Sequence, residues 1–471
     1  MAIKTIFNDS WKNTTRVKCQ GFGSIGGSVR PNPKTEPLYR CITPLQSIVL
    51  AALVSTSCGN LGLAEEEASS ISQQPRPRDI LQTVGVISNR GGIVELNNGS
   101  LMLAEGDSYQ ISTDGAETWG EEQPLNCPIR AMGLIRLQSG ELASYGDKKD
   151  GAYYFTASKD RGKTWSEPTQ ITAYPDFRPL YHSMIQLASG RLLLTGYWAG
   201  LYSWQKTDGQ LRSVHPELEY LEVSSYGLWR GQKHQVEGHG HLPEMGISLV
   251  FRSDDQGQTW QKHPGGLMGW FDFQGKPNGN CGQTSCFEPT IAETKDGNVL
   301  LLARSTVGRL VQSFSTDGGE HWSAVVPSEL PSSESPALVV TLPKTGDLLV
   351  VWNQMSREEI RRGYRRGRLS SAISTDGGHS WGHFKTIERS VGLEDRDRLP
   401  AEFPVKMVRA RDWVGPLPDK WAYFHYPNLD VVGDNVILRY SRGSPWLGIA
   451  EQNLATQQSM MRVYPIAWFY E

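Results

Sequence analysis

The side chains that could do chemistry stand immediately before short apolar stretches of the chain. In chain order, the residues that open these stretches are Arg90, Ala131, His182, Glu288, Ser335 and Tyr426. A guanidinium binds carboxylates through paired hydrogen bonds, and an imidazole or a carboxylate can transfer protons. A phenol can act as a nucleophile when a base lies beside it. If the fold gathers these residues, they predict a site that combines proton transfer with anion binding.

Each of these residues precedes a repeated unit of apolar strand, glycine turn and second apolar strand. The copies begin at Gly92, Met132, Ser183, Pro289, Pro336 and Pro427. Short strands joined by glycine-containing hairpins, repeated along a chain, are typical of a β-propeller. The copies therefore predict an all-β fold, a six-bladed β-propeller, in which residues 461–470 complete the last blade. The inner strands of a propeller begin around its axis, so the opening residues should meet there.

A second repeat follows most of these units. The pattern Ser-x-Asp-x-Gly-x-x-Trp occurs five times, with its glycine displaced by one place in the first copy. The copies begin at Ser112, Ser158, Ser253, Ser315 and Ser374. The aspartate can accept backbone N–H groups, the glycine can take a positive φ, and the tryptophan can cover an apolar layer. We interpret these Asp boxes as structural hairpin turns and assign them no catalysis.

Composition narrows the functional classes. The 471 residues include 47 Lys and Arg against 50 Asp and Glu, for a formal net charge of −3. Binding nucleic acid through phosphate contacts needs a basic excess, so we expect no nucleic acid partner. The 49 Gly, 15 Trp and 17 Tyr agree with many short strands and turns. Length alone suggests about three domains, but the repeats predict a single propeller over residues 80–471.

Residues 1–64 are expected to be a leader rather than part of the propeller. Their apolar core, residues 48–54, is too short to span a bilayer and is typical of a secretory signal. Residues 65–79 are rich in Ser, Gln, Pro and Glu, as in a flexible linker. These features predict a secreted, periplasmic or cell-surface protein without a transmembrane domain. Two alternatives stay open: a lipoprotein anchored through Cys58, and a cytosolic protein with a disordered apolar tail.

Three cysteines follow the leader. Cys281 and Cys286 could close a small loop in an oxidising compartment, which leaves Cys127. The cysteines lack the spacing of a zinc site, and His239 and His241 lack further ligands nearby. We therefore expect no metal and no cofactor.

The boxes and hairpins together resemble those of the sialidase (neuraminidase) superfamily, over roughly residues 79–471. The stretch FEPTIAETKDGNVLLLARS resembles a family segment in which a glutamate opens one strand and an arginine follows on the next. The resemblance implies those roles for Glu288 and Arg304. The stretch HYPNLDVVGDNVILRYS resembles the segment with the family's tyrosine nucleophile, which implies that role for Tyr426. A neutral tyrosine with a glutamate base avoids repulsion by a substrate carboxylate on the attacked carbon.

The resemblance also implies a cluster of three arginines that bind the substrate carboxylate. Arg304 matches the family best, and Arg90 opens the first repeated unit. For the third, the stretch RRGRLSSAISTDGG favours Arg366 over Arg368. The family's first arginine is followed by Ile-Pro, whereas two glycines follow Arg90.

The acid/base of the family is an aspartate on a sizeable loop before the first box. Here that segment is shortened to AEGDSYQI, in which Asp107 is the only aspartate. Asp107 is therefore the candidate acid/base, and His182 is a candidate for substrate binding. Insertions at residues 200–243 and 382–425 are rich in Tyr, Trp, Arg and His and are expected to shape a substrate cleft.

These residues predict a sialidase-like exo-glycoside hydrolase that removes a terminal acidic sugar from a glycan or acidic saccharide. One alternative is another carbohydrate-active propeller, a polysaccharide lyase or other exo-glycosidase, in which His182 and Tyr426 transfer protons. Another is a non-catalytic carbohydrate-binding propeller. The same residues also have structural interpretations: hydrogen bonding at a strand end for Glu288, packing for Tyr426, and a solvated basic loop for Arg366 and Arg368.

Overall fold

The computed structural model describes most of the chain after the predicted leader. The described ranges are 77–81, 91–173, 177–198, 204–207, 210–213, 226–229, 232–235, 246–277, 283–402, 405, 417–418, 421–443 and 458–471. Cys58, Arg90 and Cys281 lie outside the described residues. Cys286 is a buried free thiol. Among the described helices, none is long and apolar enough to cross a membrane.

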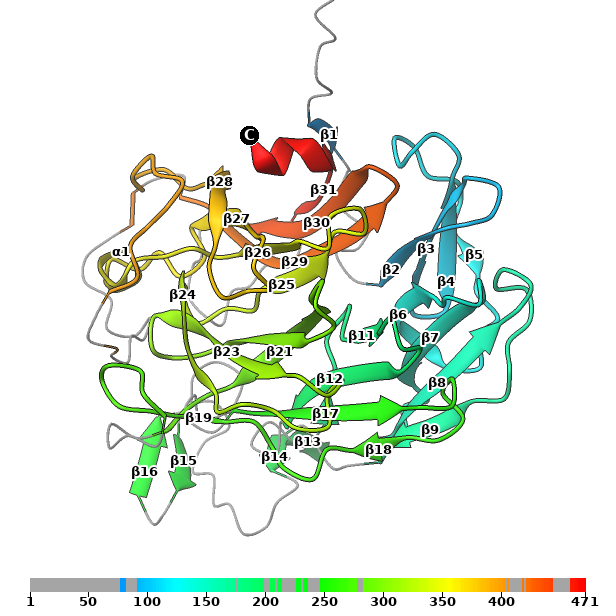
Figure 1. The fold of residues 1–471 in the computed structure, drawn as a ribbon, viewed down its shortest axis with the longest axis horizontal. Coiled ribbons are helices and arrows are strands. Elements are labelled where there is room, and N and C mark those ends of the chain that lie inside the picture. Colours follow the sequence, from blue (N-terminus) through cyan, green and yellow to red (C-terminus); the bar gives the residue numbers. More distant parts are fainter. Residues whose placement is uncertain are drawn as a thin grey trace, which may run out of the picture. The chain divides into compact units, whose positions relative to one another are not determined.

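Six antiparallel sheets of four or five strands form the blades of a propeller, so the predicted fold is confirmed (Figure 1). Blade 1 contains β2 (Gly92–Glu95), β3 (Leu101–Glu105), β4 (Ser108–Ser112) and β5 (Gln123–Pro124). Blade 2 contains β6 (Arg130–Arg136), β7 (Leu142–Asp147), β8 (Tyr153–Ser158) and β9 (Thr169–Thr172). Blade 3 contains β10 (Phe177–Arg178), β11 (Met184–Gln186), β12 (Leu192–Trp198), β17 (Ile247–Ser253) and β18 (Gln261–Lys262).

The second half of the chain forms the other three blades. Blade 4 contains β21 (Phe287–Glu293), β22 (Val299–Arg304), β23 (Arg309–Ser315) and β24 (Val326–Pro331). Blade 5 contains β25 (Leu338–Thr341), β26 (Leu348–Trp352), β27 (Arg368–Ser374) and β28 (Gly382–Arg389). Blade 6 contains β29 (Tyr423–Val432), β30 (Asn435–Gly443), β31 (Gln458–Pro465) and β1 (Arg78–Leu81).

The ring closes through both ends of the described chain. The inner strand β29 of blade 6 contacts β2 of blade 1. At the outer edge of blade 6, β1 pairs with β31, with Arg78 opposite Val463. The C-terminal segment thus completes the last blade as predicted, and a strand from before the first blade is added to it. Arg78 and Asp79, assigned to the linker from the sequence, belong to β1, so the folded part begins before residue 80.

Strand order gives the propeller two different faces. Within each blade, consecutive strands are antiparallel and hydrogen-bonded, as in the order β2-β3-β4-β5. The face on which the inner strands begin is called the site face, and it also carries the turns between second and third strands. The Asp boxes follow the third strands, so they lie on the opposite face, called the box face.

The hydrogen bonds of the Asp boxes are those of a closed turn. In the second box, Ser158 Oγ donates to Asp160 Oδ1 at 2.9 Å, and the backbone N–H of Thr164 donates to the same oxygen at 2.8 Å. The N–H of Gly162 donates to Ser158 Oγ at 2.7 Å. These bonds agree with the predicted structural turn, in which the aspartate accepts a backbone N–H. The serine hydroxyl in addition accepts the N–H of the glycine.

The core is divided among the interfaces between blades. One cluster, for example, joins Leu193 and Val250 of blade 3 to Ile291 and Leu301 of blade 4. Apolar side chains on both faces of each sheet make this possible, because each blade is covered by a neighbour on either side. The burial of these strands holds the starts of the inner strands in fixed positions on the site face.

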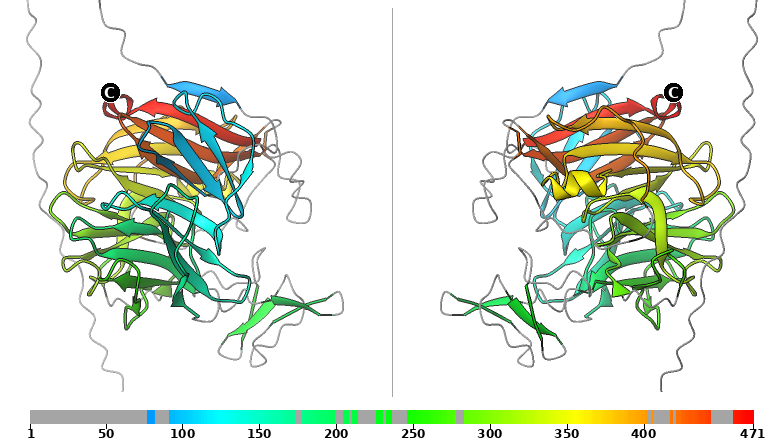
Figure 2. Two further views of the ribbon diagram at one scale, coloured as in Figure 1. Left: turned by 90° about the vertical axis from the view of Figure 1, so that its right-hand side faces the viewer. Right: turned by 90° about the vertical axis from the view of Figure 1, so that its left-hand side faces the viewer.

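The segments between strands differ from the predicted insertions. The predicted insertion 382–425 begins with β28 and ends within β29, so it is shorter than expected at both ends. The predicted insertion 200–243 contains two hairpins, shown in green in Figure 2: β13 (Trp204–Thr207) with β14 (Gln210–Ser213), and β15 (Tyr226–Trp229) with β16 (Gln232–Gln235). The remaining elements are β19 (Gly269–Trp270), β20 (Gln283–Thr284), α1 (Arg357–Arg361) and the 3₁₀ helix η5 (Ile466–Tyr470).

Candidate active site

Two inner strands carry the same local distortion at the site face. The pairing of β21 with β22 shifts register between Phe287 and Thr290, and that of β29 with β30 shifts between His425 and Asn428. Glu288 and Tyr426 sit in these bulges with φ of 47° and 52°. A bulge re-aims a side chain, and a non-glycine residue at positive φ costs about 1–3 kcal/mol. The surrounding ring must supply the free energy that holds both residues in this conformation.

The two re-aimed side chains meet. Tyr426 Oη donates a hydrogen bond to Glu288 Oε1 at 3.2 Å. The other oxygen of Glu288 accepts from Arg304 Nη1 at 2.9 Å, and Arg304 Nη2 donates to Glu334 Oε1 at 3.2 Å. Blades 4, 5 and 6 thus contribute to one chain of contacts. Glu288 and Arg304 are buried, with 4% and 8% of their surface exposed.

Charge and burial keep the phenol of Tyr426 neutral. The negative charge of Glu288, followed by burial, raises the pKa of Tyr426, while the charges of Arg366 and Arg304 oppose the shift. The guanidinium carbon of Arg366 lies 5.1 Å from the centre of the Tyr426 ring, in a cation–π contact. A neutral hydroxyl that donates to a carboxyl group is arranged to pass its proton to that group when it attacks an electrophile.

Tyr197 and His425 complete the surroundings of this pair. The ring of Tyr197, on β12, lies 4.2 Å from that of Phe287. Burial, followed by the charges of Glu288 and Tyr426, raises the pKa of Tyr197 well above its usual value. Burial, followed by the charge of Arg366, lowers the pKa of His425 to about 3. Both side chains are therefore neutral near pH 7.

His182 is held by a different set of contacts. It has a φ of 58°, like Glu288 and Tyr426. Its Nε2, however, lies 3.2 Å from Asp430 Oδ1, an oxygen that also accepts the backbone N–H of Ile93 at 2.9 Å. Asp430 Oδ2 accepts from Arg439 at 2.8 Å. His182 thus ties blade 3 to blades 1 and 6 across the ring, and its described contacts do not join it to Tyr426.

The structure separates the two candidate arginines of blade 5. Arg366 stacks on Tyr426, as described above. Arg368 is fully buried and forms a two-pronged ion pair with Glu359, with Nη1–Oε2 and Nη2–Oε1 distances of 3.1 and 2.9 Å. It also donates to the backbone carbonyls of Gln354 and Glu394. Arg368 therefore stabilises the loop around α1, and its expected place in the substrate site is corrected.

Asp107 stands on the site face at the rim of blade 1. It lies in the two-residue turn between β3 and β4 and is exposed. Its charge contributes to raising the pKa of Arg130, although the main cause is the hydrogen bond of Arg130 with Asp147. Asp107 thus lies on the same face as the starts of the inner strands, near Arg130 of blade 2.

Residues 142–437, more than half of the chain, match the BNR repeat-like domain family. This chain belongs to that family. The BNR propeller is also similar to a protein of unknown function from Dyadobacter fermentans, at 15% identity over 83% of this chain and 100% of that chain, with a TM-score of 0.46.

Named enzymes are among the similar structures as well. An α-L-arabinanase from Penicillium chrysogenum is 13% identical over 83% of this chain and 98% of that chain, with a TM-score of 0.44. A mutant sialidase from Trypanosoma rangeli with trans-sialidase activity is 12% identical over 83% of this chain and 57% of that chain, with a TM-score of 0.41. Each likeness is distant, so these activities are not carried over to the BNR propeller.

Three residues of the cluster were not predicted from the sequence of this BNR propeller. Glu334 immediately precedes Ser335, the residue expected at the start of the fifth inner strand. His425 immediately precedes Tyr426, and Tyr197 lies near the end of a second strand. A search for polar residues within one position of each inner-strand start finds the first two. Tyr197 carries no comparable signal.

Proposed function

We propose that this BNR propeller is a retaining glycoside hydrolase that removes a terminal acidic sugar of the sialic acid type from a glycan. The observation that carries the proposal is the hydrogen bond of Tyr426 with the buried Glu288, flanked by Arg304 and Arg366. A phenol activated by a carboxylate is the nucleophile expected where the attacked carbon already carries a negative carboxylate.

In the first step, Tyr426 Oη attacks the anomeric carbon and transfers its proton to Glu288. The bond to the leaving group breaks, and Asp107 donates a proton to the departing oxygen. In the second step, Asp107 removes a proton from water, which attacks the anomeric carbon. The bond to Tyr426 breaks, and the proton held on Glu288 returns to the phenolic oxygen, which restores the starting state.

In this proposal, the arginines bind the carboxylate of the substrate. Arg366 stacks over the ring of the nucleophile, so a substrate carboxylate bound there lies next to the attacked carbon. Arg304 fixes Glu288 through Nη1 and adds positive charge to the same side. Arg90 joins them in the proposal on the sequence alone. A guanidinium is suited to this role because it binds a carboxylate through two parallel hydrogen bonds.

Hydrolysis of a fluorogenic sialoside tests the proposal. We expect turnover by the native chain and its loss in Tyr426→Phe and Glu288→Gln. Tyr109→Phe is the matched control, because it removes a hydroxyl that bonds only Gln123 among the described contacts, on blade 1. A fluorinated sialosyl inhibitor should leave a covalent adduct on the peptide that contains Tyr426. Native protein without turnover or adduct would contradict the proposal.

A second candidate is an exo-glycosidase for a neutral sugar on the same pair of residues. It is favoured by one observation: Arg304 already binds two carboxylates, those of Glu288 and Glu334. A fluorogenic α-L-arabinofuranoside, tested beside the sialoside, distinguishes the two. Turnover of the neutral substrate alone, with the same loss in Tyr426→Phe, would favour this second function.

A further inference from the structure

The inner strand of blade 3 is interrupted, and the interruption brings an arginine to the site face. β11 pairs with the first half of β12, whereas β10 pairs with its end, where Arg178 lies opposite Tyr197. Second strands end on the site face, so β10 lies at that face, and His182 falls between β10 and β11. The inner strand of blade 3 therefore begins at the site face with Phe177 and Arg178, before His182.

Hydrogen bonds hold this interruption in one conformation. Tyr145 of blade 2 is fully buried; its hydroxyl donates to the carbonyl of Leu180 at 2.6 Å and accepts the N–H of Ser183 at 2.9 Å. The N–H of Leu180 donates to Ser183 Oγ at 2.7 Å. His182, in the same turn, adopts a φ of 58°. Backbone strain of this kind persists only where the surroundings fix it, so the backbone that carries Arg178 has a defined position.

Arg178 lies beside the candidate active site. Residues directly opposite on antiparallel strands share a face of the sheet, so Arg178 is a neighbour of Tyr197, whose ring lies 4.2 Å from that of Phe287. Phe287 immediately precedes Glu288. Burial, followed by the charges of Glu288 and Tyr426, raises the pKa of Tyr197, and the charge of Arg178 is among those that oppose the rise. Arg178 and the pair of Glu288 and Tyr426 thus act on one phenol.

The guanidinium of Arg178 is available to a ligand. Arg178 is exposed and forms no ion pair with a carboxylate in the part of the chain that the structure describes. Its Nη1 donates to the backbone carbonyl of Phe177 at 3.2 Å. Burial raises the pKa of Tyr153, and the charge of Arg178 and its hydrogen bond with this phenol oppose the rise. Arg178 can therefore bind an anion without first losing an ionic partner, unlike Arg304, which lies between two carboxylates.

A second arginine flanks Glu288 from the other side. Arg366 precedes β27 of blade 5 and stacks on Tyr426. Blade 4 lies between blades 3 and 5, since β21 contacts both β12 and β25. A saccharide bound at Tyr426 would therefore have a guanidinium on each side of Glu288. Guanidinium groups bind carboxylates and related oxyanions through paired, charge-assisted hydrogen bonds.

We propose that Arg178 is a substrate-binding residue, whose guanidinium binds a carboxylate or sulfate of the saccharide on the blade 3 side of the candidate active site. The identity of the ligand as a saccharide rests on the proposed function, whereas the binding of an anion by Arg178 does not. Substrates with negative charge on this side would then be preferred over neutral ones.

Direct binding tests the proposal independently of turnover. The probes are methyl glucuronoside, glucose 6-sulfate and neutral methyl glucoside, titrated calorimetrically into the full chain. Arg178→Gln is the decisive variant. Its matched control is Arg161→Gln, which removes an exposed arginine from the second Asp box, on the box face. We expect Arg178→Gln to weaken the tighter anionic probe about tenfold, through the loss of charge-assisted hydrogen bonds, and to leave the neutral probe unchanged. Arg161→Gln should change neither.

Two results would overturn the proposal. One is equal or undetectable binding of all three probes, and the other is an anion affinity in Arg178→Gln equal to that in Arg161→Gln. Arg178→Lys keeps the charge but not the planar guanidinium, so it should retain part of the affinity. Because Arg178 is exposed, each variant should unfold at the same urea concentration as the native chain, which excludes misfolding as the cause of a loss.

Turnover separates this proposal from the proposed function. If both hold, Arg178→Gln raises the KM for a fluorogenic sialoside and changes kcat little, because Arg178 holds the substrate equally before and during the reaction. Anion binding that depends on Arg178, without turnover of any glycoside, would keep its role and remove the hydrolase. Turnover with the same KM and the same anion affinity in Arg178→Gln as in the native chain would keep the hydrolase and overturn the role of Arg178.

Discussion

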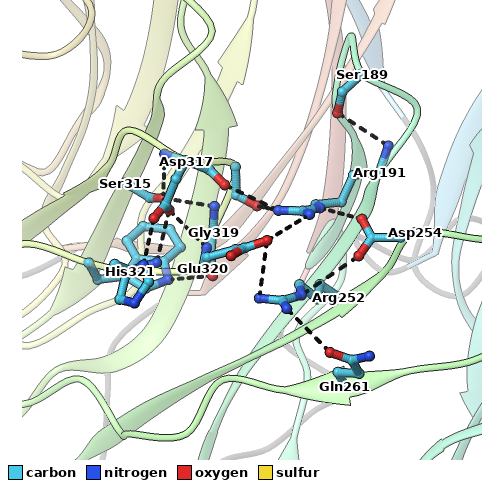
Figure 3. Close-up of polar contacts among 12 residues, drawn as sticks. Ser189, Arg191, Arg252, Asp254, Gln261, Ser315, Asp317, Gly319, Glu320 and His321 are labelled. Carbon is cyan, nitrogen blue, oxygen red and sulfur yellow. Dashed lines mark hydrogen bonds and ion pairs between the residues drawn. The ribbon is translucent and has the colours of Figure 1, made fainter.

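The two faces of the propeller use the same residue types in opposite ways. On the site face, Arg304 lies between two carboxylates that are 5% and 12% exposed. On the box face, Arg191 also lies between two carboxylates, at 2.5 Å from Asp254 and 3.0 Å from Glu320 (Figure 3). These partners are 53% and 38% exposed. The two arrangements differ in burial much more than in geometry.

This difference separates a reactive cluster from a structural one. Water screens the exposed partners of Arg191, so its ion pairs contribute little each. Arg191 adds two hydrogen bonds to the carbonyls of Asp317 and Gly318, which fasten blade 3 to the box of blade 4. The two carboxylates beside Arg304 are shielded from water, so they depend on the guanidinium for compensation. The charge of Glu288 also raises the pKa of Tyr426.

The largest effect is expected from Arg304→Ala, which leaves Glu288 and Glu334 without their shared cation. Removing one partner of a buried ion pair costs about 3–5 kcal/mol. We expect the free energy of unfolding, measured by urea titration, to fall by about that amount. A loss below about 1 kcal/mol would mean that water reaches the cluster and that the contrast with Arg191 does not hold.

The site face also shows what the sequence could and could not predict. Glu288 and Tyr426 were predictable because each precedes a proline at the start of a repeated strand, where the bulge re-aims its side chain. Arg304 followed because it ends the paired strand β22. The fold was predictable for a related reason: six hairpin units and five boxes repeat along the chain, and repeated four-stranded units are typical of a propeller.

The contacts that the sequence could not predict have a common physical cause. His182 lies beside Asp430, and Arg368 pairs with Glu359. Both contacts depend on how distant or irregular segments pack, which local patterns do not encode. The sequence pattern pointed to Ser335 instead of the neighbouring Glu334. The fifth inner strand begins only at Leu338, and the residues before it are irregular, so the pattern does not show which of them faces the site. Prediction of the site from sequence is thus limited by the conformation of the residues at strand ends.

On the box face, the next largest effect is expected from Gly257→Ala in the third box. Gly257 has a φ of 89°, and a Cβ there would lie 2.2 Å from Cε1 of Phe155 in blade 2. The unfavourable φ and the clash together should cost about 2–4 kcal/mol in urea unfolding. Gly99→Ala is the control, since Gly99 has a φ of 80° but open space around its Cα. Equal costs would show that Phe155 moves aside freely.

A smaller effect is expected from Arg191→Ala. The exposed partners of this arginine predict a loss of only about 1 kcal/mol. The loss should shrink when salt is added, because exposed ion pairs are screened, whereas the loss in Arg304→Ala should change little with salt. Unfolding titrations at low and high salt measure both. A salt-independent loss in Arg191→Ala would assign its role to the carbonyl contacts alone.

The smallest effect is expected from Ala116→Gly, in the box whose glycine is displaced. Ala116 adopts a φ of 75° and donates its N–H to Ser112 Oγ at 2.9 Å, as glycine does in the second box.

Glycine at position 116 would relieve about 1–2 kcal/mol of backbone strain. It would also lose about 0.8 kcal/mol of methyl burial against blade 6 and about 0.4–1 kcal/mol through the entropy of the unfolded chain. These contributions nearly cancel, so the free energy of unfolding, measured by thermal unfolding, should change by less than about 0.5 kcal/mol. A clear gain would mean that the methyl packs poorly, and a clear loss would mean that alanine at this position helps to close the ring between blades 6 and 1.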